Sequence, residues 1–200
     1  MSATLLPASR DPRAADLLRA AFRDVHGPRL HGFALLLALG DRGLAGAAAS
    51  RALAAGTARA DELRHPERAA AWLRARLVRE LRRSGHPHPM PVEARDLALG
   101  ELSVAPAAID ALGRLAFEER AALIAGAIER LDLADVATVL DRKLGTTRQL
   151  LRTARLHYLA AAGRSLDAVS VPALPAGELW QRVEREAAWA VGRSHAQDRP

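Results

Sequence analysis

Hydrophobic positions recur at helical spacing along most of this chain. Over residues 1–83 they form four groups, which predict helices that begin near residues 12, 29, 44 and 64. We expect Gly27-Pro28 and Gly40-Asp41 to end the first two helices, because glycine weakens a helix and proline removes a backbone donor. No run of alternating β-branched residues predicts a strand.

A segment rich in proline and glycine, residues 84–91, interrupts the helical pattern. Beyond it the spacing predicts helices over residues 107–115, 118–129 and 133–140, with a further helix after a polar break at residues 141–143. Near the C-terminus, residues 178–191 predict an amphipathic helix. Leu179, Trp180 and Val183 share one face of it, and we expect them to be buried against the body of the protein or a partner.

The stretch LADVATVLDRKLGTTRQLLRTAR, residues 133–155, predicts two helices of opposite character. One face of the first helix carries Leu133, Val136, Ala137 and Leu140. Asp132 is placed to cap its N-terminus. One face of the second helix carries Leu144, Thr147, Leu151, Ala154 and Tyr158. Arg148, Arg152 and Arg155 form a separate stripe, about 110° around the helix from that apolar face.

These patterns predict an all-α protein with two small helical domains joined by a proline-rich linker. We expect the first domain over residues 1–83 and the linker over residues 84–104. A helix-turn-helix domain is expected over residues 105–163, followed by a hinge and amphipathic tail helix over residues 164–200.

The charge of the chain adds a candidate partner to this helical picture. There are 29 basic and 23 acidic residues, a formal net charge of +6, and Lys143 is the only lysine. Arginine stays charged at physiological pH and binds phosphate through a planar fork. The basic excess therefore favours nucleic acid or another anionic surface as a partner. Composition alone leaves open a soluble helical protein from an arginine-rich proteome.

The sequence offers little for catalysis, metal binding or membrane insertion. It has no cysteine, which excludes disulfides and thiolate metal sites and suits a cytoplasmic location. His86 and His88 have no third ligand nearby and make a poor metal site. Phosphate-loop, zinc and nucleophile-elbow motifs are missing, so we expect no enzyme activity and no cofactor. The longest apolar run, residues 33–39, is too short to span a bilayer, and we expect no membrane association.

A short apolar helix followed by an arginine-striped helix is the layout of a DNA-reading helix-turn-helix. The second helix packs one side on its neighbours and inserts its N-terminal turns into the major groove. Short polar side chains near its start could meet base edges, and Arg152 and Arg155 further along could meet phosphates. We predict DNA contacts at Lys143, Thr146, Thr147, Arg148, Gln149, Arg152 and Arg155. The alternative is an ordinary helical hairpin with a solvated arginine face.

Residues 111–159 resemble the promoter-binding C-terminal domain of the extracytoplasmic-function sigma factors. That family's pattern, roughly aLxxLpxxxRxaLxLxxxexLsxxEIAxxLgxsxGTVxxrlxRAxxxL, fits this segment without a gap. The matching residues are Leu112, Leu115, Arg120, Ala122, Leu123, Leu131, Val136, Ala137, Leu140, Gly145, Thr146, Leu151, Ala154, Arg155 and Leu159. The resemblance implies a domain that reads the −35 promoter element.

The N-terminal part is similar, in order and length, to the other domain of the same family. Residues 16–45 look like its first two helices, and AAAWLRARL, residues 69–77, looks like the start of its promoter-melting helix. The resemblance implies binding to core RNA polymerase. Arginines along this helix could contact DNA or polymerase, namely Arg74, Arg76, Arg79, Arg82 and Arg83.

The chain departs from the family pattern in several functional places. Where the family has an acidic, amide-bearing helix that grips polymerase, this chain has GAAASRALAAG, residues 46–56. The melting helix is about one turn shorter than the family's. In the helix-turn-helix, Asp141 stands where the family has glycine and Thr147 where it has an apolar residue.

The leading interpretation is a sigma-like transcription initiation factor that binds core RNA polymerase and promoter DNA. Residues 46–56 motivate one alternative, a DNA-binding regulator that has lost polymerase binding. The tail tryptophans motivate another, a protein-interaction scaffold with no role on DNA. An anti-sigma protein is a further partner that the resemblance suggests.

Overall fold

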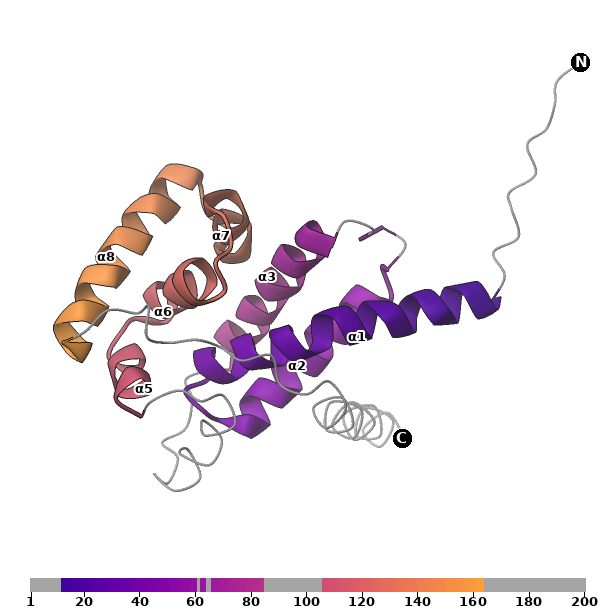
Figure 1. The fold of residues 1–200 in the computed structure, drawn as a ribbon, viewed down its shortest axis with the longest axis horizontal. Coiled ribbons are helices and arrows are strands. Elements are labelled where there is room, and N and C mark those ends of the chain that lie inside the picture. Colours follow the sequence, from indigo (N-terminus) through magenta and orange to yellow (C-terminus); the bar gives the residue numbers. More distant parts are fainter. Residues whose placement is uncertain (1–11, 61, 64–65, 85–105, 164–200) are drawn as a thin grey trace, which may run out of the picture.

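The computed structural model describes residues 12–60, 62–63, 66–84 and 106–163, and every regular element in them is helical (Figure 1). The all-α class predicted from hydrophobic spacing is confirmed. The helices are α1 (Pro12–Leu37), α2 (Arg42–Thr57), α3 (Pro66–Ser84), α5 (Pro106–Gly113), α6 (Phe117–Leu123), the π-helical turn η1 (Ile124–Ile128), α7 (Leu133–Leu140) and α8 (Leu144–Ala162). None of these described helices is long and apolar enough to cross a membrane.

Helix α1 continues through Gly27 and Pro28, so the predicted break at this pair is wrong. Pro28 cannot donate a hydrogen bond to the carbonyl of Asp24, but Asp24 is exposed, so water can satisfy that carbonyl. Beyond the proline, residues 33–38 are all buried. Each buried leucine in this run contributes about 1.5–3 kcal/mol, which together outweighs the roughly 3 kcal/mol that an interior proline costs.

Helix α2 is built from small residues that let its neighbours approach closely. Its N-terminus is capped by Asp41, whose carboxylate accepts a hydrogen bond from the amide of Leu44 at 2.9 Å. The helix packs against both α1 and α3. At Gly56 a Cβ atom would lie only 2.6 Å from Cδ2 of Leu73 on α3 and 3.1 Å from the ring of Phe22, so a larger residue there would force these side chains to shift. The helix predicted near residue 44 is confirmed.

The C-terminal helices follow the predicted pattern, with one local difference. The helix predicted over residues 118–129 is an α-helix only to Leu123 and then widens into η1. Arg130 follows with φ of 56°, a left-handed conformation that ends the element. Helix α7 has the bounds that its spacing predicts, and α8 starts directly after the predicted break at residues 141–143.

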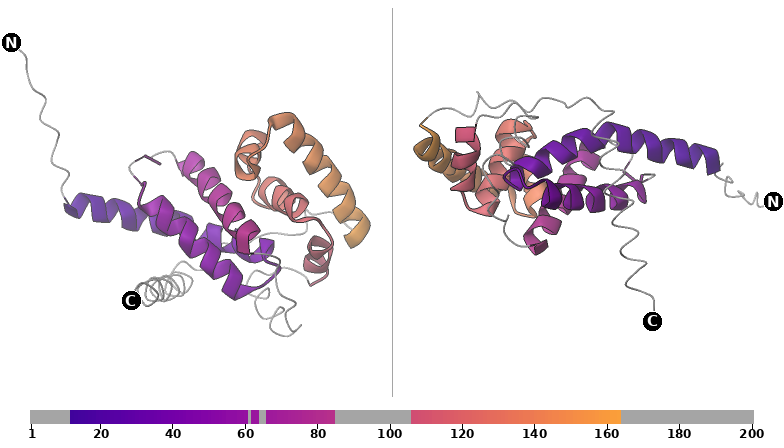
Figure 2. Two further views of the ribbon diagram at one scale, coloured as in Figure 1. Left: turned by 180° about the vertical axis from the view of Figure 1, so that it is seen from behind. Right: turned by 90° about the horizontal axis from the view of Figure 1, so that it is seen from below.

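Helices from the two halves of the chain share one hydrophobic core. Helix α3 packs along α7, and α1 contacts α6 and η1. The buried apolar residues form a single cluster that runs from Phe22 to Tyr158. Figures 1 and 2 show α3, α7 and α8 side by side in that order. The division into two domains stays a prediction, and residues 85–105 and 164–200, which hold the predicted linker and tail, lie outside the described residues.

Candidate nucleic-acid interface

A short turn, residues 141–143, joins helices α7 and α8. Asp132 caps α7 by accepting a hydrogen bond from the amide of Asp135 at 2.7 Å, as the sequence predicts. Asp141 then adopts a left-handed conformation, with φ of 55° and ψ of 51°, and ends the helix. Lys143, in an extended conformation, is the N-cap residue that precedes α8. The turn therefore sets the angle between the two helices.

One face of α8 is fixed in the core, and this determines which residues face outward. Thr147, Ala154 and Tyr158 are buried, and Leu150 and Leu151 are partly buried beside them. Helix α8 packs on α5, α6 and α7. At Gly126 a Cβ atom would lie 3.0 Å from Cδ2 of Leu151, so η1 and α8 approach closely at this point. The outward face of α8 is thus held on a rigid support.

The predicted arginine stripe lies on that outward face. Arg148, Arg152 and Arg155 are exposed, and within the described residues none of them has an ion-pair partner. They border a groove of about 380 Å³ whose apolar wall is formed by Leu133, Leu151 and Leu156. Lys143, Thr146 and Gln149 are also exposed near the start of α8. Three unpaired guanidinium groups on one helix face can each bind a phosphate or a guanine edge.

Thr147 is the one residue among the predicted DNA contacts of α8 that is buried, and its prediction as a DNA contact is corrected. Its side chain is fully buried, and its hydroxyl donates to the carbonyl of Lys143 at 3.1 Å. The reason is its position, because Thr147 lies on the apolar face together with Ala154 and Tyr158. Thr146, one residue earlier, is exposed and faces away from the core. Gly145 is also open, since a Cβ atom there would meet nothing within 4 Å.

The predicted arginines of α3 divide into buried and surface groups. Arg74 is 4% exposed and pairs with Glu129, so its prediction as a DNA or polymerase contact is corrected. Its guanidinium also donates to the carbonyl of Ala70 and lies 5.6 Å above the ring of Phe33. A buried charge of this kind needs its partner, and Arg74 therefore joins α3 to the end of η1.

The other four predicted arginines of α3 reach the surface. Arg76 and Arg83 pair with Glu80, at 3.2 Å and 3.3 Å, and Arg51 of α2 pairs with the same carboxylate. Arg82 pairs with Glu118 of α6 at 3.2 Å. Arg79 is exposed, and its Nε donates to the carbonyl of Ala75 in its own helix. These arginines remain available to an anion in competition with the carboxylates.

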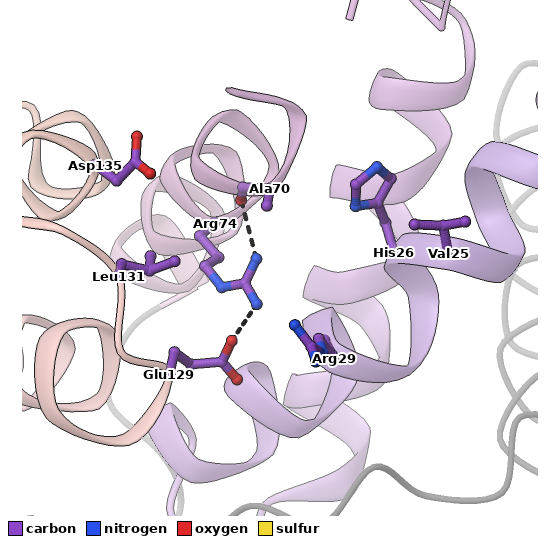
Figure 3. A pocket seen from close by; sticks show the side chains of 8 residues that line it. All are labelled: Val25, His26, Arg29, Ala70, Arg74, Glu129, Leu131 and Asp135. Atoms are coloured by element: carbon purple, nitrogen blue, oxygen red, sulfur yellow. Dashed lines mark hydrogen bonds and ion pairs between the residues drawn. The ribbon is translucent and has the colours of Figure 1, made fainter. Parts of the chain in front are cut away.

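A second concave site lies where α1, α3 and the loop before α7 meet (Figure 3). This cleft has a volume of about 430 Å³, and Arg74 and Glu129 face His26 and Arg29 across it. Burial lowers the pKa of His26, and the positive charge of Arg74 lowers it further. Arg29 and Arg74 balance Glu129 and Asp135 around the cleft, so it lacks the excess of positive charge found on α8.

Sequence reasoning missed the side chains that join elements far apart in the chain. Glu118 contacts both Arg82 and Arg142, and Arg120 reaches the end of α1. No periodic signal predicts these contacts, because their partners are 24 to 83 residues away. Leu156 and Leu159 were also unexpected, since both are large apolar side chains exposed on α8. The predicted tail face at Leu179, Trp180 and Val183, and the histidines of the linker, lie outside the described residues.

We compared the chain with models of protein families, with curated proteins and with solved structures, and none of them matches it. The candidate interface combines a helix held on one face by the core, three exposed arginines that have no ion-pair partner in the described part of the chain, and short polar side chains at the start of that helix.

Proposed function

We propose that this chain is a sigma-like transcription factor that binds duplex DNA through α8. The observation that supports this most directly is the set of exposed arginines at positions 148, 152 and 155, which have no ion-pair partner among the described residues and lie on a helix whose other face is buried. A protein gains little stability from unpaired like charges on one helix face, because they repel one another. An anionic partner accounts for the arrangement.

Duplex DNA fits this surface better than an isolated anion does. A helix with its side chains is about 10–12 Å across, which matches the major groove of about 12 Å. Helix α8 has 19 residues. Its first turns expose the polar side chains of Thr146 and Gln149, and the basic stripe continues further along the helix. Thr146 and Gln149 would then meet base edges, while Arg152 and Arg155 would bind phosphates. Gly145 leaves room for a close approach of the sugar-phosphate backbone.

The step from DNA binding to transcription initiation rests on the sigma-factor resemblance. In that reading α8 recognises promoter DNA, and the N-terminal helices bind core RNA polymerase. Co-purification with core polymerase, and competition with another sigma factor for it, test this step. Absence of any polymerase binding at low salt would remove the initiation role and leave DNA binding intact.

A second candidate is a DNA-binding regulator that does not contact polymerase, and α2 favours it. At the positions where the resemblance places polymerase-gripping side chains, Gly46 and Ser50 are buried in the core. Ala47 is a small side chain, and Arg51 is paired with Glu80. The helix thus offers few side chains to a partner.

DNA binding itself is tested by titrating a fluorescent duplex with the full chain over a series of salt concentrations. We expect binding to weaken steeply as salt rises, because each phosphate contact releases condensed counterions. The variant Arg148→Ala/Arg152→Ala/Arg155→Ala should lose most of this binding. The matched control replaces three exposed arginines elsewhere, namely Arg29, Arg68 and Arg114. Equal binding by the α8 variant and the parent, with both folded, would refute the proposal.

A further inference from the structure

The cleft between α1, α3 and the loop before α7 contains a guanidinium group with unused donors (Figure 3). Nη1 of Arg74 donates to the carbonyl of Ala70 at 3.1 Å, and Nη2 donates to Glu129. These two bonds leave the guanidinium on opposite sides, and the second N–H group of each Nη atom has no partner among the described residues. The two remaining N–H groups form a fork at the tip of Arg74, which Figure 3 shows directed across the cleft towards His26 and Arg29.

The core fixes the position of this fork before any ligand binds. The side chain of Arg74 is buried, and its guanidinium carbon lies 5.6 Å from the centroid of the Phe33 ring. Helix α3 packs on α7, and the ion pair with Glu129 holds Arg74 at the end of η1. A planar fork of this kind matches the two oxygens of a carboxylate, and a preorganised donor loses little side-chain entropy on binding.

The charges around the cleft favour a ligand that has both signs of charge. The lining contains two guanidinium groups, on Arg29 and Arg74, and two carboxylates, on Glu129 and Asp135. Burial and the positive charge of Arg74 lower the pKa of His26, so its imidazole is neutral at neutral pH. The lining therefore has no net charge. An inorganic phosphate or a polyamine would bring an uncompensated charge into the cleft, whereas a zwitterion would bring none.

The remaining lining is apolar and limits the size of the ligand. Val25 and Leu131 line the cleft, and Val25 is 62% exposed, so a ligand in the cleft could cover a large apolar side chain. The volume of about 430 Å³ is near the lower end of the range for small-molecule sites, roughly 300–1,000 Å³. The cleft is therefore suited to a small metabolite with a short apolar part.

We propose that this cleft binds a small α-amino acid with an apolar side chain. The carboxylate of the ligand accepts hydrogen bonds from the fork of Arg74 and lies beside Arg29. Its ammonium group donates to Glu129, and its side chain covers Val25 and Leu131. The two charged groups of an α-amino acid are attached to one carbon, and Arg74 and Glu129 are likewise adjacent because they form an ion pair. Charges of opposite sign then alternate around the head group of the ligand.

The proposed site is separate from the candidate DNA-binding surface. Its lining residues come from α1, α3, α7 and the segment between η1 and α7, and they include none of the exposed arginines of α8. The inference therefore does not depend on the proposed function. A ligand here contacts α3 and the start of α7 together, so its binding should raise the temperature of thermal unfolding.

Isothermal titration calorimetry of the full chain tests the site with alanine, valine, leucine, methionine and phenylalanine. We expect at least one of them to bind saturably, with one site per chain. The tightest binder is then compared with its amine, which lacks the carboxylate, and with its deaminated acid. For leucine these analogues are isopentylamine and 4-methylpentanoate. Each should bind at least about tenfold more weakly, because each leaves a charged group of the cleft without its contact.

Two variants test the position of the ligand. Arg29→Gln removes a charge beside the ligand carboxylate, and Ala70→Leu adds bulk to the wall of the cleft. Each should weaken binding by about tenfold or more. The matched controls are Arg68→Gln and Ala54→Leu, at exposed helical positions outside the lining, and both should bind like the parent. Thermal unfolding without ligand checks that every variant is folded.

The outcomes are distinct. Absence of saturable binding by all five amino acids would refute the proposal. Equally tight binding of the amine or the deaminated acid, or tighter binding of inorganic phosphate, would overturn the assignment of an amino acid. Unchanged binding by folded Arg29→Gln and Ala70→Leu variants would place the ligand outside this cleft. The variant Arg148→Ala/Arg152→Ala/Arg155→Ala should bind the amino acid like the parent, so a failure of DNA binding leaves this inference standing.

Discussion

Arg120 of α6 donates a hydrogen bond from Nη1 to the carbonyl of Leu37, at 3.0 Å, across 83 residues of sequence. The same guanidinium donates to the carbonyls of Leu112 and Leu115, at 3.0 Å and 3.2 Å. All three acceptors lie at or near helix ends, where carbonyls lack a partner within their own helix. The carbonyl of Leu112 also accepts from the amide of Leu115 at 3.2 Å. Burial lowers the pKa of Arg120, yet arginine remains charged, so the side chain satisfies three buried groups at once.

Replacing Arg120 should therefore cost more stability than its size suggests. Arg120→Met keeps the apolar stem but leaves the carbonyls of Leu37 and Leu115 without a donor, while the carbonyl of Leu112 keeps the amide of Leu115. We expect a loss of about 3 kcal/mol in the free energy of unfolding. Urea denaturation measures it. Arg114→Ala is the control, since Arg114 is exposed and its replacement should stay within about 0.5 kcal/mol. An Arg120→Met variant as stable as the parent would show that these bonds contribute nothing net.

Arg120 also marks the limit of what the sequence predicts about this fold. The spacing of apolar residues gives the helices, the start of α7 at its Asp132 cap and the turn at residues 141–143. These features are local, because each depends on residues that are close together in the sequence. Contacts such as Arg120 with Leu37 depend on how distant helices pack, which no local pattern encodes.

Two errors in the prediction have the same origin. The break expected at Gly27-Pro28 reflects intrinsic propensity, and the burial of residues 33–38 overrides it. The sequence predicts Arg74 as a surface residue because other arginines surround it on α3. In the structure its side chain is buried against Glu129 at the end of η1. For the candidate site, the spacing correctly placed Arg148, Arg152 and Arg155 on an exposed face. It could not show that Glu118 joins Arg82 of α3 to Arg142 of the turn.

The left-handed conformation of Asp141 offers a way to stabilise the turn. A non-glycine residue at φ of 55° is strained, and glycine adopts this conformation without a steric penalty. Asp141→Gly should raise the free energy of unfolding by about 0.5–1 kcal/mol, and Asp141→Ala should lower it by a similar amount. Thermal or urea unfolding checks both. The same sign for the two variants would contradict the strain argument.

The burial of Thr147 separates it from Thr146 in a DNA-binding assay. Thr147→Val removes a hydroxyl whose acceptor, the carbonyl of Lys143, keeps the backbone hydrogen bond from residue 147. We expect stability to change by less than about 1 kcal/mol and DNA affinity to stay constant. Thr146→Val, at an exposed position, should weaken DNA binding instead. Weaker binding by a folded Thr147→Val variant would show that Thr147 reaches the DNA after all.

His26 should make stability depend on pH. Its pKa is lowered in the folded protein by burial and by Arg74, so the unfolded chain binds a proton at a higher pH than the folded one does. The stability that the neutral His26 contributes is therefore fully present above the ordinary histidine pKa. It is lost as the pH falls from there towards the lower pKa of His26 in the folded protein. The slope contributed by this group corresponds to at most one proton. Urea denaturation from pH 7.5 to 5 should show a shallower decline for His26→Gln than for the parent, and parallel curves would contradict the assignment.

The start and the middle of α8 should differ in how they affect DNA recognition. Arg152→Ala removes a phosphate contact in the proposed complex, so it should weaken binding to all sequences alike and flatten the salt slope by about one unit. Gln149→Ala removes a base contact, so it should change the preference at one base pair by roughly 1–3 kcal/mol and leave the slope unchanged. Titration of a small panel of duplexes at several salt concentrations measures both effects. Phosphate contacts carry charge without sequence information, and amide contacts to bases carry sequence information without charge. The assignment of roles along α8 is therefore wrong if Arg152→Ala weakens binding to some duplexes more than to others, or if Gln149→Ala changes the salt slope.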